Sequence, residues 1–124
     1  MTKKILLIED EPALQETLGD FLKSSGFNVV SAFDGLSGVE MAKKEKPDLV
    51  ILDLILPKKN GFEVLTDLKK NPATSVIPVM VLTNLESAED VDRALEGGAS
   101  AYLVKTNYRL EEVLEKVKTL LSEK

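Results

Sequence analysis

The stretch Leu49-Val50-Ile51-Leu52-Asp53 decides the fold of this sequence. Four apolar residues in a row, without alternating polar positions, are typical of a strand that is covered on both faces of a parallel sheet. The carboxylate that follows has apolar neighbours, and a charge in such surroundings is costly unless another group pairs with it. The stretch therefore predicts a buried strand that ends in a functional residue.

On both sides of this strand, short apolar runs alternate with amphipathic segments. The predicted strands are residues 4–8, 27–32, 49–52, 79–82 and 101–104. The predicted helices are residues 12–25, 36–44, 62–70, 87–96 and 110–121, the fourth of them started by Ser87 with Asp90 in a pattern close to a capping box. This alternation predicts the α/β class: a doubly wound, five-stranded parallel sheet of the flavodoxin-like (βα)5 type. We expect residues 1–124 to form a single domain, without an effector domain.

The composition excludes several classes of chemistry. The chain has 124 residues, the usual size of one domain, and contains no cysteine and no histidine. Disulfides, thiolate metal sites and histidine-based catalytic triads are therefore impossible. A net charge of −5 argues against direct nucleic-acid binding. Because the apolar run at residues 5–8 is too short for a signal peptide or a membrane span, we expect a cytoplasmic protein without membrane contact.

Residues that can do chemistry follow four of the five predicted strands: Glu9, Asp10, Asp53, Thr83 and Lys105. Each has an ordinary structural explanation when taken singly, as a helix cap or a solvated surface residue. In a doubly wound sheet, however, functional groups gather outside the carboxyl ends of the strands. Carboxylates gathered there raise each other's pKa unless a hard cation such as Mg²⁺ binds them. With a lysine and a hydroxyl nearby, the set predicts a phosphoryl-transfer site.

The same residues, with their immediate neighbours, match the motifs of a known family. They are Glu9-Asp10-Glu11, then Asp53 followed by Leu56-Pro57 and Gly61, then Thr83, then Tyr102-Leu103-Val104-Lys105. In identity and spacing this pattern resembles the receiver domain of two-component response regulators, the CheY-like domains, and the resemblance covers essentially the whole chain. It implies a phospho-accepting receiver that acts in phosphorelay signal transduction.

The resemblance also implies roles for individual residues. Asp53 would be the phospho-acceptor and would form an acyl phosphate. Glu9, Asp10, Asp53 and the backbone carbonyl of Ile55 would hold Mg²⁺, or Mn²⁺ in its place. Lys105 would form a salt bridge to a phosphate oxygen. The chain would be no enzyme in the ordinary sense, since it would catalyse only its own phosphorylation and dephosphorylation.

A switch is the second implication of the resemblance. Thr83 would bond the phosphoryl group and move toward it, and Tyr102 would turn inward into the vacated space. Phosphorylation would thereby shift the face formed by the fourth helix, fifth strand and fifth helix between two states. The implied partners are a sensor histidine kinase or a phosphotransfer protein as donor, and a downstream effector that the sequence does not identify.

Four positions depart from the family pattern. Thr106 follows Lys105 where the family usually has proline, so the sequence leaves open whether the peptide bond between them is cis. Asn84 replaces a small residue, and it could narrow access to the phosphoryl group or cap the next helix. Ile55 and Leu85, which flank the path of the attacking water in this family, are both apolar here. We expect these two side chains to exclude water and to make dephosphorylation slow.

Three other functions compete with the phospho-switch. A receiver-like docking module that is never phosphorylated is the alternative that stays open, although the presence of all the site residues argues against it. A phosphohydrolase with an aspartyl nucleophile typically needs a second carboxylate two residues later, where this chain has Ile55. A flavodoxin-like cofactor carrier needs a phosphate-binding loop after the first strand, where Glu9-Asp10-Glu11-Pro12 would instead repel a phosphate in the absence of metal.

Overall fold

The computed structural model describes residues 2–122 and shows one sheet of five parallel strands. The strands are β1 (Lys4–Ile8), β2 (Asn28–Ala32), β3 (Leu49–Leu52), β4 (Val79–Thr83) and β5 (Ala101–Val104). Their order in the sheet is β2-β1-β3-β4-β5. The strand order therefore reverses at β1 and β3, because β2 is added on one side of β1 and β3 on the other. The predicted fold class is confirmed.

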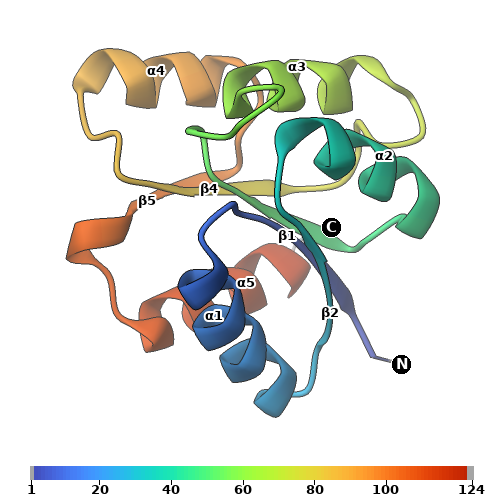
Figure 1. The fold of residues 1–124 in the computed structure, drawn as a ribbon, viewed down its shortest axis with the longest axis vertical. Coiled ribbons are helices and arrows are strands. Elements are labelled where there is room, and N and C mark those ends of the chain that lie inside the picture. The colour runs from blue at the N-terminus through green and yellow to red at the C-terminus, as the bar shows by residue number, and fades with distance from the viewer. Residues whose placement is uncertain (1, 123–124) are drawn as a thin grey trace.

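Helices cover both faces of the sheet (Figure 1). They are α1 (Pro12–Ser24), α2 (Gly35–Glu45), α3 (Gly61–Lys70), α4 (Ala88–Glu96) and α5 (Leu110–Ser122). Figure 1 shows α1 and α5 on one side and α2, α3 and α4 on the other. A strand between two helical layers buries both of its faces, which is why the central strands are apolar without interruption. None of the helices in residues 2–122 is long and apolar enough to cross a membrane.

The alternation along β1 shows how the two layers share the sheet. Ile5 and Leu7 pack in the cluster that includes buried residues of α1 and α5. Leu6 and Ile8 point the other way, into the cluster that includes buried residues of α2 and α3. All four side chains are at most 1% exposed. The sheet is thus held rigidly from both sides, which fixes the positions of the residues that follow its strands.

The predicted element boundaries are correct to within two residues. The second strand begins at Asn28 rather than at Phe27, because the Phe27 amide still donates to the carbonyl of Leu22 at 3.2 Å in the turn after α1. The third helix begins one residue early, at Gly61. Asn60 caps it, and the Asn60 side chain and Glu63 form a reciprocal capping box that the sequence reading missed.

Two further differences lie near the functional edge of the sheet. Thr83 is part of β4, where it pairs with Val104, rather than lying in a turn after the strand. The fourth helix begins at Ala88, and its cap is the predicted Ser87, which accepts from the Asp90 amide at 3.1 Å. The alternative that Asn84 caps this helix is therefore wrong.

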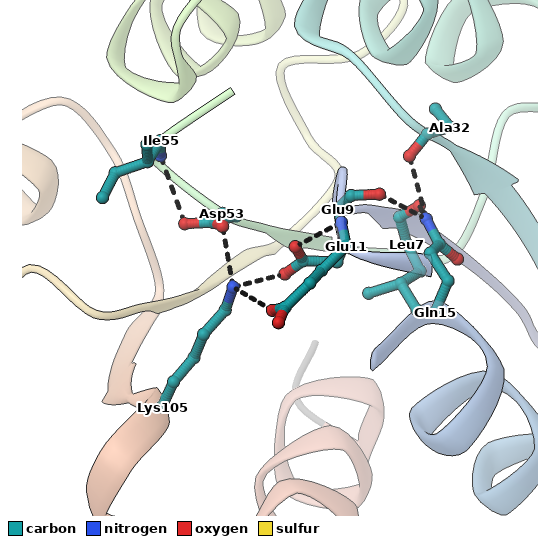
Figure 2. A network of polar contacts seen from close by, with 8 residues as sticks. All are labelled: Leu7, Glu9, Glu11, Gln15, Ala32, Asp53, Ile55 and Lys105. Atoms are coloured by element: carbon teal, nitrogen blue, oxygen red, sulfur yellow. Dashed lines mark hydrogen bonds and ion pairs between the residues drawn. The ribbon is translucent and has the colours of Figure 1, made fainter. Parts of the chain in front are cut away.

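The segment after β5 is a short 3₁₀ turn, Lys105–Asn107, which the sequence reading did not predict. The structure contains no cis peptide bond within residues 2–122, so the bond between Lys105 and Thr106 is trans. The backbone of Lys105 directly follows β5, and its side chain is directed back toward the ends of β1 and β3 (Figure 2). The replacement of proline at position 106 thus leaves Lys105 at the site.

Candidate functional site

The sheet register brings the predicted acids together. β1 and β3 are neighbours with Ile8 opposite Leu52, so Glu9 and Asp53 follow the strands side by side. The Asp53 amide donates to the Ile8 carbonyl at 3.1 Å, which continues the ladder by one more bond. Glu9, Asp10 and Asp53 each offer a carboxylate oxygen, and these oxygens lie within 4.8 Å of one another. The geometry therefore concentrates three negative charges at one point.

The three acids differ in their contact with solvent. Glu9 and Asp53 are only 2% and 4% exposed, whereas Asp10 is exposed. Burial raises the pKa of the Glu9 carboxyl, and the nearby charge of Asp53 adds to this effect. Hydrogen bonds from Lys105 and from the Glu11 amide favour the ionised form but do not outweigh burial. The cluster is consequently short of positive charge.

Lys105 supplies the one cation inside the cluster among the described residues (Figure 2). Its ammonium nitrogen lies 2.8 Å from Asp53 Oδ2 and 2.7 Å from Glu9 Oε1, with Glu11 Oε1 at 3.8 Å. Burial disfavours the charged lysine, but the hydrogen bonds to Asp53 and Glu9 are together stronger and raise the pKa of Lys105. A single charge shared by three carboxylates leaves the site able to attract a further cation.

The second oxygen of Asp53 faces the loop that leads to α3. Asp53 Oδ1 accepts from the Ile55 amide at 3.2 Å, so the backbone of Ile55 lies beside the carboxylate. Gly61 closes this loop, because its amide donates to the Leu54 carbonyl at 2.9 Å. A Cβ atom at Gly61 would come within 2.4 Å of the Asp53 carbonyl oxygen. The glycine of the motif is therefore needed for the close approach of α3 to the site.

Thr83 completes the edge from the far side of β3. It is fully buried, and its hydroxyl has no hydrogen-bond partner within the described chain. A buried hydroxyl without a partner loses its hydration without compensation. Because β4 lies between β3 and β5, the hydroxyl comes from the strand flanked by those of Asp53 and Lys105. An anionic ligand with free oxygens at Asp53 would satisfy this donor.

Tyr102 of β5 pairs with Val81 of β4, two residues before Thr83, and is partly buried. Its hydroxyl donates to the Leu85 carbonyl at 2.7 Å, and the ring packs against a cluster that includes Leu54, Val81 and Ala94. Burial raises the pKa of Tyr102, and the charges of nearby aspartates act in the same direction. One hydrogen bond and apolar contacts thus hold the Tyr102 side chain in this structure. Ile55, two residues after Asp53, is 54% exposed, and Leu85, two residues after Thr83, is half-buried.

One polar residue at this edge escaped the sequence reading. Gln15 of α1 is buried, and its side-chain amide donates to backbone carbonyls at the ends of β1 and β2. The signal was available, since Gln15 occupies the same helical stripe as the buried Leu18 and Leu22, three and seven residues later. A polar residue on an apolar stripe indicates a buried hydrogen-bonding role.

Known proteins resemble this chain in both sequence and fold. The family model described as the response regulator receiver domain matches residues 5–118. RpaA of Synechocystis, a DNA-binding dual master transcriptional regulator, is 39% identical over 118 residues, which cover 95% of this chain and 48% of RpaA. The transcriptional regulatory protein CiaR of Streptococcus pneumoniae is 42% identical over 118 residues, which cover 95% of this chain and 51% of CiaR.

A solved structure gives the same result. The Mn²⁺-bound form of the response regulator Rcp1 has a TM-score of 0.81 and 35% identity, and the match covers 97% of this chain and 92% of that one. The present chain spans about half the length of the two curated relatives. The match to the family model, however, extends over all five strands. The chain therefore belongs to the family of response regulator receiver domains, which serve phosphorelay signalling in two-component systems.

Proposed function

We propose that Asp53 accepts a phosphoryl group from a phosphohistidine of a sensor histidine kinase or a phosphotransfer protein. The observation that carries this proposal is the environment of the Asp53 carboxylate. It is 4% exposed, bonded to Lys105 at 2.8 Å, and part of a three-carboxylate cluster. A buried carboxylate among like charges is an unstable arrangement for a merely structural residue. It suits a nucleophile whose charge is offset during the reaction.

The residues also fit a divalent cation. Carboxylate and carbonyl oxygens are the ligands of Mg²⁺ and Mn²⁺, and we assign them to Glu9, Asp10, Asp53 and the carbonyl of Ile55. The Mn²⁺-bound form of the response regulator Rcp1, which is 35% identical to this chain, supports the binding of a divalent cation. A cation held by these residues would supply positive charge to the oxygens of the incoming phosphoryl group. Lys105 already forms ion pairs with Glu9 and Asp53, so a cation bound by these carboxylates would compete with Lys105.

The transfer balances with the groups at hand. An oxygen of the Asp53 carboxylate forms a bond to phosphorus, and the bond from phosphorus to the donor imidazole nitrogen breaks. The electron pair of the broken bond stays on the imidazole, which can then take up a proton. Lys105 moves its ion pair from the Asp53 carboxylate to a phosphoryl oxygen, and the Thr83 hydroxyl donates to another. Thr83 thereby gains the hydrogen-bond partner that it lacks in the unphosphorylated chain. Lys105 exchanges one negatively charged partner for another.

The output of the switch follows from the position of Thr83. Movement of the Thr83 hydroxyl toward the phosphoryl group would change the space beside Tyr102, whose own hydroxyl donates to the Leu85 carbonyl in the loop before α4. We assign the output to the face formed by α4, β5 and α5, where an effector would bind one state in preference to the other. The proposal includes a cytoplasmic location and no direct contact with nucleic acid or membrane.

The test is the intact mass of the protein after incubation with acetyl phosphate, in Mg²⁺ or in EDTA. One phosphoryl adduct is expected in Mg²⁺, none in EDTA and none in Asp53→Asn. Asp34→Asn is the matched control, because Asp34 also follows a strand and caps α2, a role that asparagine can keep. That variant should still take up one phosphoryl group.

Two results would contradict the proposal. An adduct that persists in Asp53→Asn would place the acceptor elsewhere. A complete lack of adduct, both with acetyl phosphate and with a phosphorylated histidine donor, would instead favour a docking module that is never phosphorylated.

A further inference from the structure

Gln15 bonds to the backbone from which Glu9 and Asp10, two members of the acidic cluster, project. The side chain is 6% exposed, and its amide nitrogen lies 3.0 Å from the Leu7 carbonyl oxygen, 3.0 Å from that of Glu9 and 2.9 Å from that of Ala32. Figure 2 shows the side chain reaching from α1 to these three oxygens. One residue of a helix thus connects the ends of β1 and β2 to the first acid of the site.

The orientation of this amide is fixed by its surroundings. A primary amide has two N–H groups, so three carbonyl oxygens share two hydrogens. If the amide were rotated by half a turn, its own oxygen would face the three carbonyl oxygens, which would repel it. In the observed orientation the Gln15 Oε1 atom is buried without a partner in the described chain. The contact is therefore kept although one of its own polar atoms is unsatisfied.

The hydrogen bonds of Gln15 affect the carboxylates of Glu9 and Asp10 by fixing the peptide group between these two residues. The Glu9 amide donates to the Ala32 carbonyl at 3.0 Å, and the Glu9 carbonyl accepts from Gln15. Both backbone groups of Glu9 are thus held. Because the Glu9 carbonyl belongs to the peptide group that ends at the Cα atom of Asp10, its orientation also sets the direction in which the exposed Asp10 side chain leaves the backbone.

We propose that Gln15 is a positioning residue for divalent-cation binding: its side-chain amide fixes the peptide between Glu9 and Asp10, so that these two carboxylates converge with that of Asp53. The inference rests on the metal-dependent function proposed above. It assigns no contact between Gln15 and the cation. Residues that orient metal ligands without touching the metal commonly change its affinity by about 10- to 100-fold when they are replaced.

The test compares Gln15→Met with Thr74→Val. Methionine keeps the length of the side chain but has no N–H donor, so the peptide after Glu9 loses its restraint. The control Thr74→Val also removes a buried bond from a side chain to a backbone carbonyl, that of Leu68 at 2.7 Å, and it lies at the far end of the sheet. Each protein is titrated with Mg²⁺ by calorimetry, and its thermal unfolding is recorded in EDTA.

We expect Gln15→Met to bind Mg²⁺ at least about tenfold more weakly than the parent, while Thr74→Val binds it with the parental Kd. Both variants should unfold at lower temperature in EDTA, so a change in Kd confined to Gln15→Met separates positioning from stability. If Gln15→Met does not fold, Gln15→Asn replaces it, because the shorter side chain withdraws the amide from the three carbonyls.

The outcomes separate this inference from the function on which it rests. A parent chain that binds Mg²⁺ with the same Kd as the Gln15 variant would overturn the positioning role and leave the proposed function intact. A parent chain that binds no Mg²⁺ at millimolar concentration would overturn both. Equal weakening in Gln15→Met and Thr74→Val would show that Mg²⁺ affinity follows general stability, which also contradicts the inference.

Discussion

The two ends of the sheet use the same side-chain types in different ways. At the end where α3 leads into β4, Thr74 Oγ1 donates to the Leu68 carbonyl at 2.7 Å. Lys69 Nζ donates to the carbonyls of Ser75 and Ile77 at 3.1 and 2.8 Å. We call this end the amino edge, because the strands begin there. Its buried threonine and its half-buried lysine both have backbone partners.

The opposite end, where the strands terminate, is the carboxyl edge. There the buried Thr83 hydroxyl has no partner, and Lys105 faces carboxylates of Glu9 and Asp53 instead of carbonyls. Within residues 2–122, the two buried side-chain atoms without a hydrogen-bond partner are Thr83 Oγ1 and Gln15 Oε1, and both lie at this edge. The amino edge is arranged for stability, whereas the carboxyl edge keeps unsatisfied groups that a ligand can use.

The largest effect should come from removing the charge of Lys105. We expect Lys105→Met to slow phosphoryl uptake from acetyl phosphate by about 100-fold or more, because one donor to the developing charge is lost. Intact mass as a function of time, at saturating Mg²⁺, measures the rate. Lys69→Met is the matched control at the amino edge, and its rate should equal that of the parent. Equal losses in both variants would show that the two lysines act only through stability.

The two buried threonines give a more direct comparison. Valine has nearly the shape of threonine, so each substitution removes a hydroxyl with little change in packing. Thr74→Val should lower the free energy of unfolding by about 1–3 kcal/mol, because the Leu68 carbonyl loses its partner. Thr83→Val should raise it by about 1 kcal/mol, because the hydroxyl that it removes is buried without a bond.

Denaturation by urea, followed by circular dichroism in EDTA, measures both free energies. If the Thr83 hydroxyl bonds the phosphoryl group as proposed, Thr83→Val should still be phosphorylated but should not shift the face formed by α4, β5 and α5. If both threonine variants lose similar stability, the contrast between the edges is wrong. In that case Thr83 would have a partner, such as a bound water, that makes it equivalent to Thr74.

Most of the fold could be predicted from the sequence, because burial on two faces leaves a plain pattern. The strand at residues 49–52 has no polar residue, and such runs, alternating with amphipathic helices, are typical of a parallel sheet between two helical layers. Once the strand order of a doubly wound sheet is assumed, the residues after the strands must meet. The convergence of Glu9, Asp53 and Lys105 was predictable for that reason, whereas their chemical roles remain proposals.

Side-chain contacts between segments could not be predicted in the same way. The capping box of Asn60 and Glu63 was missed because the predicted helix began at residue 62, which left Asn60 outside the capping position. The contacts of Gln15 depend on carbonyls of β1 and β2, and nothing in the local pattern of α1 names those acceptors. Sequence periodicity fixes which face a residue lies on, but the partner on that face depends on the assembled sheet.

A third prediction concerns the apolar side chains at the carboxyl edge. Ile55 and Leu85 carry no polar group that could orient a water molecule toward phospho-Asp53. Ile55→Asn combined with Leu85→Glu should therefore speed the loss of phosphate by about tenfold, the rate equivalent of about 1.4 kcal/mol. The decay of the phosphoryl adduct after removal of the donor, measured by intact mass, gives the rate. A decay at the parental rate would contradict the proposed exclusion of water.

The smallest predicted effect is on stability at alkaline pH, where Lys69 and Lys105 should change the free energy of unfolding with opposite sign. Burial lowers the pKa of Lys69 in the folded chain below its usual value of 10.5, so the charged form is less favourable there than in the unfolded chain. The charged lysine therefore lowers the free energy of unfolding at pH values below the pKa that Lys69 has in the folded chain. This loss disappears as the pH rises toward 10.5. Relative to Lys69→Met, the parent should gain stability over that range.

Lys105 should behave in the opposite way. Despite burial, its bonds to Asp53 and Glu9 raise its pKa above 10.5, so the stability that it contributes is present below 10.5 and is lost as the pH rises through the raised value. Relative to Lys105→Met, the parent should therefore lose stability at high pH. Urea denaturation of the parent and both variants across alkaline pH gives the two differences, in which the titration of all other groups largely cancels. Differences of the same sign would mean that carboxylate and carbonyl partners shift the pKa of a partly buried lysine in the same direction. The contrast between the two edges would then rest on the threonines alone.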